Sequence, residues 1–197
     1  MTRIIITALS LGGACGYFFA DEGFLQWSEN LIVAGLSLML FFVGMDMGYD
    51  GTVLKNIKKA GFKILVFPFA TVIGTLAGSF AGSVILDMKV NEAMAVGSGL
   101  GWYTLAPFII DPYSQELSAI SFMSNVFREV LSLILIPVVG KYTGYIEATC
   151  LPGAAAMDVC IPVIEKSTNA EMVFYAFVSG TVLSALVPVL VPLFLGL

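Results

Sequence analysis

The sequence predicts an all-α, polytopic membrane protein, a helical bundle, and three observations support this fold class. Of the 197 residues, 58% are hydrophobic and 12% are charged, and that charged share is about half that of an ordinary soluble domain. The mean hydropathy is +0.96. The apolar residues form successive runs of roughly 20 residues, the length that a helix needs to cross a bilayer. A soluble globular domain and a disordered chain are therefore excluded.

The apolar runs predict about seven passes through the lipid bilayer, and the connections between the passes are short. Short connections favour one integral membrane domain over residues 1–197. The first run follows Arg3 as in a signal peptide, but acidic residues and further apolar runs come after it, so we interpret it as a retained span. The predicted passes are 4–20, 30–49, 62–86, 92–110, 116–140, 148–165 and 171–195.

The basic residues predict the orientation of these passes. Four lysines lie between the second and third passes, and the positive-inside bias places this loop in the cytoplasm. Counting from it puts Arg3 and Lys166 inside as well, and Lys89 and Lys141 outside. We therefore predict a multi-pass membrane protein with its N-terminus in the cytoplasm and its C-terminus outside. The four lysines are Lys55, Lys58, Lys59 and Lys63.

The charge and the residue types exclude several functions. A net charge of -5 argues against a nucleic-acid partner, because phosphate backbones bind basic proteins. The chain has no histidine, and its cysteines lie in or beside apolar runs without the C-x-x-C spacing of a metal or redox site. We expect no metal, no cofactor and no enzyme, although an aspartyl pair of Asp46 and Asp158 stays open as a catalytic alternative. The cysteines are Cys15, Cys150 and Cys160.

Two of the predicted passes contain helix-breaking residues. The fourth carries Gly97, Gly99 and Gly101, and each glycine weakens a helix by about 1 kcal/mol relative to alanine. The sixth contains Pro152 and Gly153 and, further on, an acid. Irregular backbone at membrane depth persists only against protein or a water-filled cavity, and two such segments are typical of a transporter's substrate site. Re-entrant or kinked helices with a purely structural role are the alternative.

Asp158 is an acid inside the short sixth pass, flanked by apolar residues. An ionised side chain at the bilayer centre costs on the order of 3 kcal/mol, so this residue needs a partner or a function. The functional interpretations are a proton carrier and a counter-ion for a cationic substrate. A structural salt bridge to Arg128 is the alternative.

A polar stripe follows one face of the fifth pass, within an arc of about 100°. Such a stripe on a membrane helix faces a cavity or other helices rather than lipid. Arg128 and Glu129 point about 100° apart, so they can share an aqueous cavity without pairing, and a structural role is an equal alternative. Asp46, near the cytoplasmic end of the second pass, lies either at a cavity mouth or in the interface. The stripe comprises Ser118, Ser121, Asn125, Arg128, Glu129 and Ser132.

Four stretches of the chain resemble the LysO-type family of lysine exporters, and the resemblance spans essentially the whole chain. The first stretch is Gly97–Leu105, with its Gly-Trp-Tyr motif. The second is Arg128-Glu129 with Leu135-Ile136-Pro137, and the third is Ala156-Met157-Asp158 with Ile161-Pro162-Val163. The fourth is Leu186–Leu190. The Gly-Trp-Tyr and Met-Asp motifs in this order are quite specific to the family.

The resemblance implies an inner-membrane permease that expels L-lysine and the toxic analogue thialysine, in exchange for protons. It also implies that Asp158 matches an intramembrane acid important for export. The chain resembles the C-terminal two thirds of typical members, so a homodimer or a separate small subunit would complete it. An acid is common in the family at the position of Asn125, which leaves open whether proton coupling uses the same groups here.

These observations together predict an exporter of lysine or a similar cationic amino acid. Asp158 would bind either a proton or the substrate ammonium, with Trp102, Tyr103 and the backbone carbonyls of the broken passes lining the site. The alternatives are a cation/proton antiporter or another small-solute transporter on a similar scaffold, and a non-transporting membrane subunit. The further candidate site residues are Asp46, Asn125, Arg128 and Glu129.

Overall fold

The computed structural model describes residues 2–19, 34–35, 38, 41–42, 45 and 64–197. The chain divides into two units, Met1–Lys59 and Ala60–Leu197, and each is described by itself. In the first unit the helix α1 covers Thr2–Phe19, where the first pass is predicted. Asp46 and the four lysines of the predicted cytoplasmic loop lie outside the described residues.

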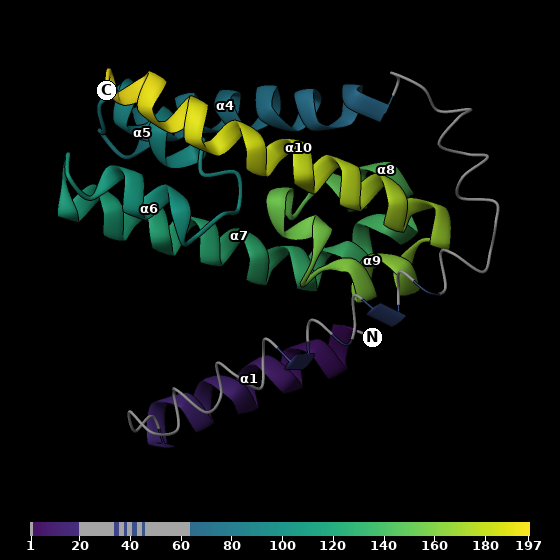
Figure 1. Ribbon diagram of the computed structural model, residues 1–197. Helices are drawn as coiled ribbons and strands as arrows, with labels where there is room; N and C mark the ends of the chain where they lie inside the picture. The colour runs from purple at the N-terminus through teal and green to yellow at the C-terminus, as the bar shows by residue number, and fades with distance from the viewer. Residues whose placement is uncertain (1, 20–33, 36–37, 39–40, 43–44, 46–63) are drawn as a thin grey trace. The chain divides into compact units, whose positions relative to one another are not determined.

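Three long helices form the frame of the second unit (Figure 1). α4 covers Val66–Ile85, α7 covers Gln115–Tyr142 and α10 covers Ala170–Leu195. All three are long and apolar enough to cross a membrane, and they lie where the third, fifth and seventh passes are predicted. The described residues are helical or irregular and contain no strand. The prediction of a helical membrane protein is confirmed at this level.

The second unit has an apolar core, but its surface is unlike that of a soluble protein. Large apolar side chains point outwards on the long helices, as at Ile73 (68% exposed) and Leu193 (65% exposed). Several polar side chains are buried beside the apolar core, among them Ser121, Asn125 and Ser132. A continuous apolar surface is a liability in water but suits lipid, and buried polar groups can hydrogen-bond between helices there.

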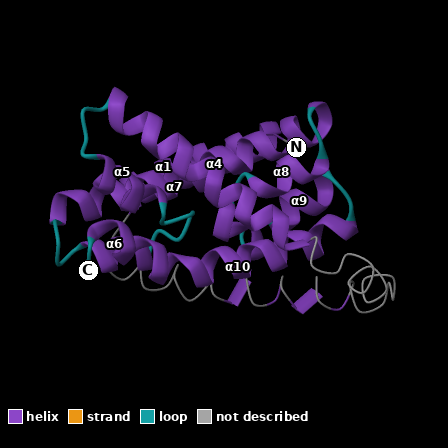
Figure 2. Cartoon of the chain, turned by 90° about the horizontal axis from the view of Figure 1, so that it is seen from above, coloured by secondary structure: helices purple, strands orange, loops and turns teal. Residues whose placement is uncertain are grey.

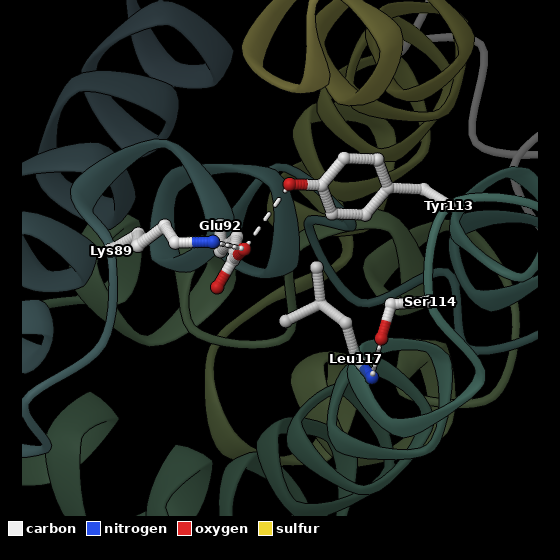
Figure 3. A network of polar contacts seen from close by, with 5 residues as sticks. All are labelled: Lys89, Glu92, Tyr113, Ser114 and Leu117. Carbon is white, nitrogen blue, oxygen red and sulfur yellow. Dashed lines mark hydrogen bonds and ion pairs between the residues drawn. The ribbon is translucent and has the colours of Figure 1, made fainter.

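Side-chain caps mark the starts of α7 and α10. Ser114 accepts a hydrogen bond from the Leu117 N–H at the start of α7 (Figure 3), and Asn169 accepts one from the Met172 N–H at the start of α10. α10 ends at Gly196, whose φ of 71° is a left-handed conformation that glycine adopts without strain. Because these caps are made within a few residues, the ends of long helices are predictable from the sequence.

The predicted fourth pass is a hairpin rather than a crossing. α5 covers Val90–Gly97, α6 covers Leu105–Ile110, and the chain reverses between them. The two outer ends of the hairpin lie together, because the Tyr113 hydroxyl donates to the Glu92 carboxylate at 3.1 Å (Figure 3). The prediction that residues 92–110 cross the bundle is therefore wrong. Hydropathy measures the length of an apolar run and not a change of its direction.

The predicted sixth pass is a hairpin as well. α8 covers Tyr145–Cys150, the 3-10 helix η2 covers Gly153–Met157, and α9 covers Ile161–Ser167. The end of α9 returns to the end of α7, where a Cβ on Gly140 would lie 2.9 Å from the Ser167 carbonyl oxygen. Within residues 64–197, three helices are long enough to cross a membrane where five passes are predicted.

The two hairpins enter the bundle from opposite ends. In Figures 1 and 2, α5 and α6 lie at the end that holds the C-terminus, and α8 and α9 lie at the other end. The hairpin tips meet between these ends, where the Ala154 N–H donates to the Leu100 carbonyl oxygen at 2.8 Å. The chain thus repeats one motif, a long helix followed by a hairpin, in opposite directions, as α4–α6 and α7–α9. Inverted repeats of this kind are common in transporters.

Candidate substrate-binding site

Two glycines allow the hairpin tips to touch. Gly101 has a φ of 100° and Gly153 has a φ of 69°, a region that residues with a Cβ rarely adopt. A Cβ on Gly101 would lie 2.6 Å from the Pro152 carbonyl oxygen, and one on Gly153 would collide with the Leu100 carbonyl oxygen. Any other residue at either position would be strained and would push the tips apart.

Two polar side chains of α7 hold the tips in place. The Asn125 side-chain oxygen accepts a hydrogen bond from the Gly101 N–H at 2.7 Å, and its amide nitrogen donates to the Ser121 carbonyl oxygen at 2.8 Å. About one turn further along α7, Arg128 Nε donates to the Leu151 carbonyl oxygen at 3.1 Å. These bonds satisfy backbone groups that the interrupted helices leave free and that lipid cannot pair.

A cavity of about 190 Å³, which we call the acidic cavity, lies against both tips. The carboxylates of Glu129 and Asp158 and the aromatic side chains of Trp102 and Tyr103 line it. It is smaller than the roughly 300 Å³ of a typical drug-sized pocket and would hold about six waters at ~30 Å³ each, so it suits a small solute. The other lining residues are Gly101, Thr104, Ala154, Ala155, Met157, Val159 and Ser184.

The two carboxylates of the acidic cavity form no ion pair within the described residues. Asp158 accepts a hydrogen bond from the Val159 N–H at 2.6 Å, and Glu129 Oε2 is buried with no hydrogen-bond partner in the described part of the chain. The one ion pair of residues 64–197 joins Lys89 to Glu92, away from this cavity. Because a buried carboxylate needs a proton or a cation, the acidic cavity is suited to take up either.

Arg128 lies outside the acidic cavity. It forms no ion pair with Asp158, so the structural salt bridge considered for these two residues does not occur. Its Nη1 donates to Thr75 Oγ1 of α4 at 3.2 Å, and its side chain lines a second cavity of about 360 Å³, which we call the arginine cavity. Because neighbours on a helix point about 100° apart, Arg128 and Glu129 face different cavities instead of sharing one.

The structure divides the predicted site residues among three places. The acidic cavity is lined by Gly101, Trp102, Tyr103, Glu129 and Asp158. The arginine cavity is lined by Gly97, Asn125 and Arg128. Pro152 and Gly153 form the second hairpin tip, and Gly99 packs against Asn125. Asp46 lies outside the described residues.

Two residues of α10 contribute to the acidic cavity and were not predicted. Ser184 lines it, with its hydroxyl 3.8 Å from the Met157 sulfur. Gly180, one turn earlier, lets η2 approach closely, since a Cβ on it would lie 2.6 Å from the Met157 Cβ. The signal in the sequence is small residues four positions apart on a strongly apolar helix, a pattern of close helix packing in membranes.

Membrane-length helices, opposed hairpins and a polar cavity at their tips are the features of a solute transporter. Comparison with protein families agrees, because the family described as lysine exporter LysO matches residues 6–195. The chain belongs to this family of lysine exporters, and the resemblance found in its sequence is confirmed.

The chain is similar to two relatives, and it covers a different share of the length of each. It is 32% identical to the lysine exporter LysO of Escherichia coli over 174 residues, which cover 87% of this chain and 57% of that protein. It is 30% identical over 196 residues to a Haemophilus influenzae protein provisionally named a lysine exporter, with 96% of each chain covered. The chain thus spans a little over half of the first relative, somewhat less than the expected two thirds. No solved structure matches the chain.

Proposed function

We propose that this chain exports L-lysine, or a similar cationic amino acid, in exchange for protons. The observation that carries the proposal is the acidic cavity, where two carboxylates with no ion-pair partner among residues 64–197 lie at the meeting point of two opposed hairpins. The names of the family and of both relatives support lysine as the substrate.

Asp158 is the proposed exchange group. Its carboxylate binds either a proton or the side-chain ammonium of lysine, because protonation removes the charge that attracts the ammonium. Glu129 supplies a second acceptor through its unpartnered Oε2. Trp102 and Tyr103 line the same cavity, and aromatic rings attract an ammonium that lies over their faces. Backbone carbonyls of the interrupted helices complete the site.

Exchange with protons removes the electrical opposition to export. Moving Lys⁺ out of a cell against an inside-negative potential costs about 2.3 kcal/mol per 100 mV. The inward movement of one H⁺ compensates this charge, so the complete cycle is electroneutral and the proton concentration gradient drives it.

The arrangement of the hairpins supports a C-terminus outside the cell. The start of α4 lies beside the start of α10, where the Phe67 and Tyr175 rings are 5.5 Å apart. Because α9 returns to the end of α7, Lys141 and Lys166 lie together at the end of the bundle where α4 and α10 start. The predicted passes put these two lysines on opposite sides of the membrane. We assign this end and the lysines that precede α4 to the cytoplasm, and Lys89 to the outer end. The two passes that the sequence predicts before α4 would then place the N-terminus in the cytoplasm.

The proposed transporter contains a second membrane chain, either a second copy of this chain or a separate small subunit. The chain spans 57% of the Escherichia coli relative and 96% of the Haemophilus influenzae relative. Cross-linking in native membranes distinguishes the two, because a homodimer gives a product of twice the mass of the chain and a complex with a small subunit gives a lighter one.

Lysine release from proteoliposomes tests the exchange. Vesicles loaded with radiolabelled L-lysine and containing the wild-type protein are expected to release lysine when the external pH is lowered, and to acidify inside as they do so. Asp158→Asn is expected to abolish this release, because an amide neither binds a proton at these pH values nor attracts an ammonium. Glu116→Gln is the matched control, since Glu116 is exposed at the start of α7 and outside the acidic cavity.

The possible outcomes separate the alternatives. Undiminished release by Asp158→Asn would overturn the role of Asp158. Proton-coupled release of Na⁺ or K⁺ without release of lysine would establish a cation/proton antiporter instead. Transport that depends entirely on another protein, and not on any acidic-cavity residue, would establish a non-transporting subunit.

A further inference from the structure

We infer that the arginine cavity is a second binding site for the substrate, where Arg128 binds the carboxylate of the amino acid. The inference rests on the proposed function and states which part of the same substrate this cavity recognises. Four observations support it: the extent of the cavity, its separation from the acidic cavity, the free hydrogen-bond donors of Arg128 and the chemistry of the remaining wall.

The arginine cavity extends from the hairpin tips to one end of the bundle. Its volume of about 360 Å³ is nearly twice the 190 Å³ of the acidic cavity. Arg128 and Asn125 line its inner part, and Leu86 and Met88 line it at the connection between α4 and α5. This connection lies at the end of the bundle that we assign to the outside, so the cavity is on the exit route of an exported solute.

The first hairpin tip separates the two cavities, which share no lining residue. Gly97 lines the arginine cavity and Gly101 lines the acidic cavity. The residues between them, 98–100, are buried. The Leu100 carbonyl is bonded to the second tip. A solute must pass this contact to move from one cavity to the other, so each cavity can hold it on its own side.

The guanidinium of Arg128 has more N–H donors than the hydrogen bonds it forms within the described residues use. An arginine carries five N–H donors, and Arg128 donates one bond to Leu151 and one to Thr75. It is in no ion pair with a carboxylate of residues 64–197. A cation held away from water needs an anion. The planar guanidinium also matches a carboxylate with two parallel hydrogen bonds, which favours a carboxylate over other anions of similar size.

The rest of the wall suits a small amino acid. Ala93, Val96 and Ile120 supply apolar surface for an aliphatic chain, and the hydroxyls of Ser79 and Ser124 supply a few polar contacts. A mostly apolar site with a small number of polar groups is the usual form of a small-molecule site. The acidic cavity therefore recognises the ammonium of lysine, and the arginine cavity recognises its carboxylate.

Filling the arginine cavity tests the inference. Gly78 lines the cavity, and a Cβ on it would meet nothing within 4 Å, so Gly78→Leu adds a side chain at the cavity wall without a clash at its Cβ. Gly74 lies one turn earlier on α4, is equally open and lines neither cavity, so Gly74→Leu is the matched control. In proteoliposomes, Gly78→Leu is expected to raise the lysine KM by at least about tenfold, and Gly74→Leu to leave it unchanged.

A substrate without the carboxylate tests the chemistry. Cadaverine is lysine without that group, and the wild-type protein is expected to prefer L-lysine to it by at least about tenfold, because a site that hydrogen-bonds a substrate group rejects analogues without it. Arg128→Lys keeps the positive charge but cannot form the two parallel hydrogen bonds to a carboxylate. It is expected to reduce the preference for L-lysine over cadaverine. If Arg128→Lys does not fold, the decision rests on Gly78→Leu, which leaves Arg128 in place.

Three results would overturn the inference or what it rests on. Gly78→Leu with the wild-type KM and the wild-type preference would overturn it alone, since lysine transport itself would be intact. Equal losses in Gly78→Leu and Gly74→Leu would also overturn it, because the effect would then belong to the packing of α4. No lysine transport by the wild-type protein, reconstituted with any small subunit that the cross-linking identifies, would in contrast overturn the proposed function.

Discussion

The acidic cavity and the arginine cavity are lined by adjacent residues of one helix and carry opposite charges. Glu129 faces a space of about 190 Å³ and has an unpartnered oxygen. Arg128 faces a space of about 360 Å³ and donates hydrogen bonds to the Leu151 carbonyl oxygen and to Thr75. Because they are neighbours in sequence, the two side chains point to different faces of α7, and a hairpin tip lies between these faces. The two charges therefore do not pair with each other. Both charges therefore stay available for the substrate contacts that we propose.

The contact between the tips is expected to give the largest effect, because both cavities depend on it. Gly153→Ala places a Cβ against the Leu100 carbonyl oxygen at a φ of 69°. A left-handed conformation alone costs an alanine about 1–2 kcal/mol, and the collision adds to this. We expect a large fall in the melting temperature in detergent and loss of lysine exchange.

Gly196→Ala is the control for the strain in that prediction. Gly196 has nearly the same φ, 71°, but a Cβ on it meets nothing within 4 Å. The Gly196→Ala variant is expected to lose only the stability that the strain of an alanine in the left-handed conformation costs. Equal falls in melting temperature for the two variants would show that the tips do not press on each other at Gly153.

The two charges of α7 are expected to affect stability in opposite directions. Arg128→Met removes the donors to the Leu151 carbonyl and to Thr75, and losing hydrogen bonds from a charged group costs about 1.5–3 kcal/mol. Glu129→Gln removes a carboxylate with a buried, unpartnered oxygen and is expected to keep or raise the melting temperature while it lowers exchange. A lower melting temperature for Glu129→Gln than for Arg128→Met would contradict this difference between the cavities.

Asn125 is expected to have a smaller effect than Arg128. Asn125→Ala leaves the buried Gly101 N–H without its acceptor, which costs about 1–3 kcal/mol. Ser124→Ala alters an exposed neighbour that lines the same arginine cavity and has no such bond, so its melting temperature should match that of the wild type. Hydrogen exchange at Gly101 distinguishes a local loosening of the first tip from a general loss of stability.

The polar network at the ends of the first hairpin should show the smallest effect (Figure 3). Lys89, Glu92 and Tyr113 lie outside the three membrane-length helices. The hydrogen bond from Lys89 lowers the pKa of Glu92 below its ordinary 4.5, and the same bond raises the pKa of Lys89 above its ordinary 10.5. The contribution of Glu92 is present above pH 4.5 and is lost as the pH falls through its lowered pKa. That of Lys89 is present below pH 10.5 and is lost as the pH rises through its raised pKa.

Glu92→Gln checks this pH dependence. Its melting temperature should be slightly lower than that of the wild type at neutral pH, because exposed ion pairs stabilise little, and the difference should vanish once the pH is below the lowered pKa of Glu92. A difference that persists in acid would mean that Glu92 acts through packing and not through its charge. Neither cavity is touched, so lysine exchange at neutral pH should be unchanged.

Much of the fold follows from local properties of the sequence. The long helices α4, α7 and α10 begin and end within a few residues of the predicted passes, because hydropathy, length and caps such as Ser114 are read within each segment. The family was also recognisable, because its motifs are short and ordered. The glycines of the fourth predicted pass mark the first hairpin tip, although a broken crossing was the main interpretation and a re-entrant segment the alternative.

The same residues could not decide between a broken crossing and a re-entrant reversal for either hairpin. A glycine such as Gly101 permits a turn, but the direction in which the chain leaves it depends on contacts with segments far away in the sequence. Those contacts include the bond from Ala154 to Leu100 and the bond from Gly101 to Asn125. The correction also moves Lys141 to the same end as Lys166, which a count of passes could not do.

The sequence by itself determined that this chain is an α-helical membrane protein of the LysO family, with few charges and a handful of them inside the bundle. Apolar length and residue type are local quantities, and they are sufficient for these conclusions. Only the tertiary structure decided that Asp158 and Glu129 line one cavity and Arg128 another. The physical reason is that the faces of α7 acquire different surroundings only when the two hairpin tips meet against it.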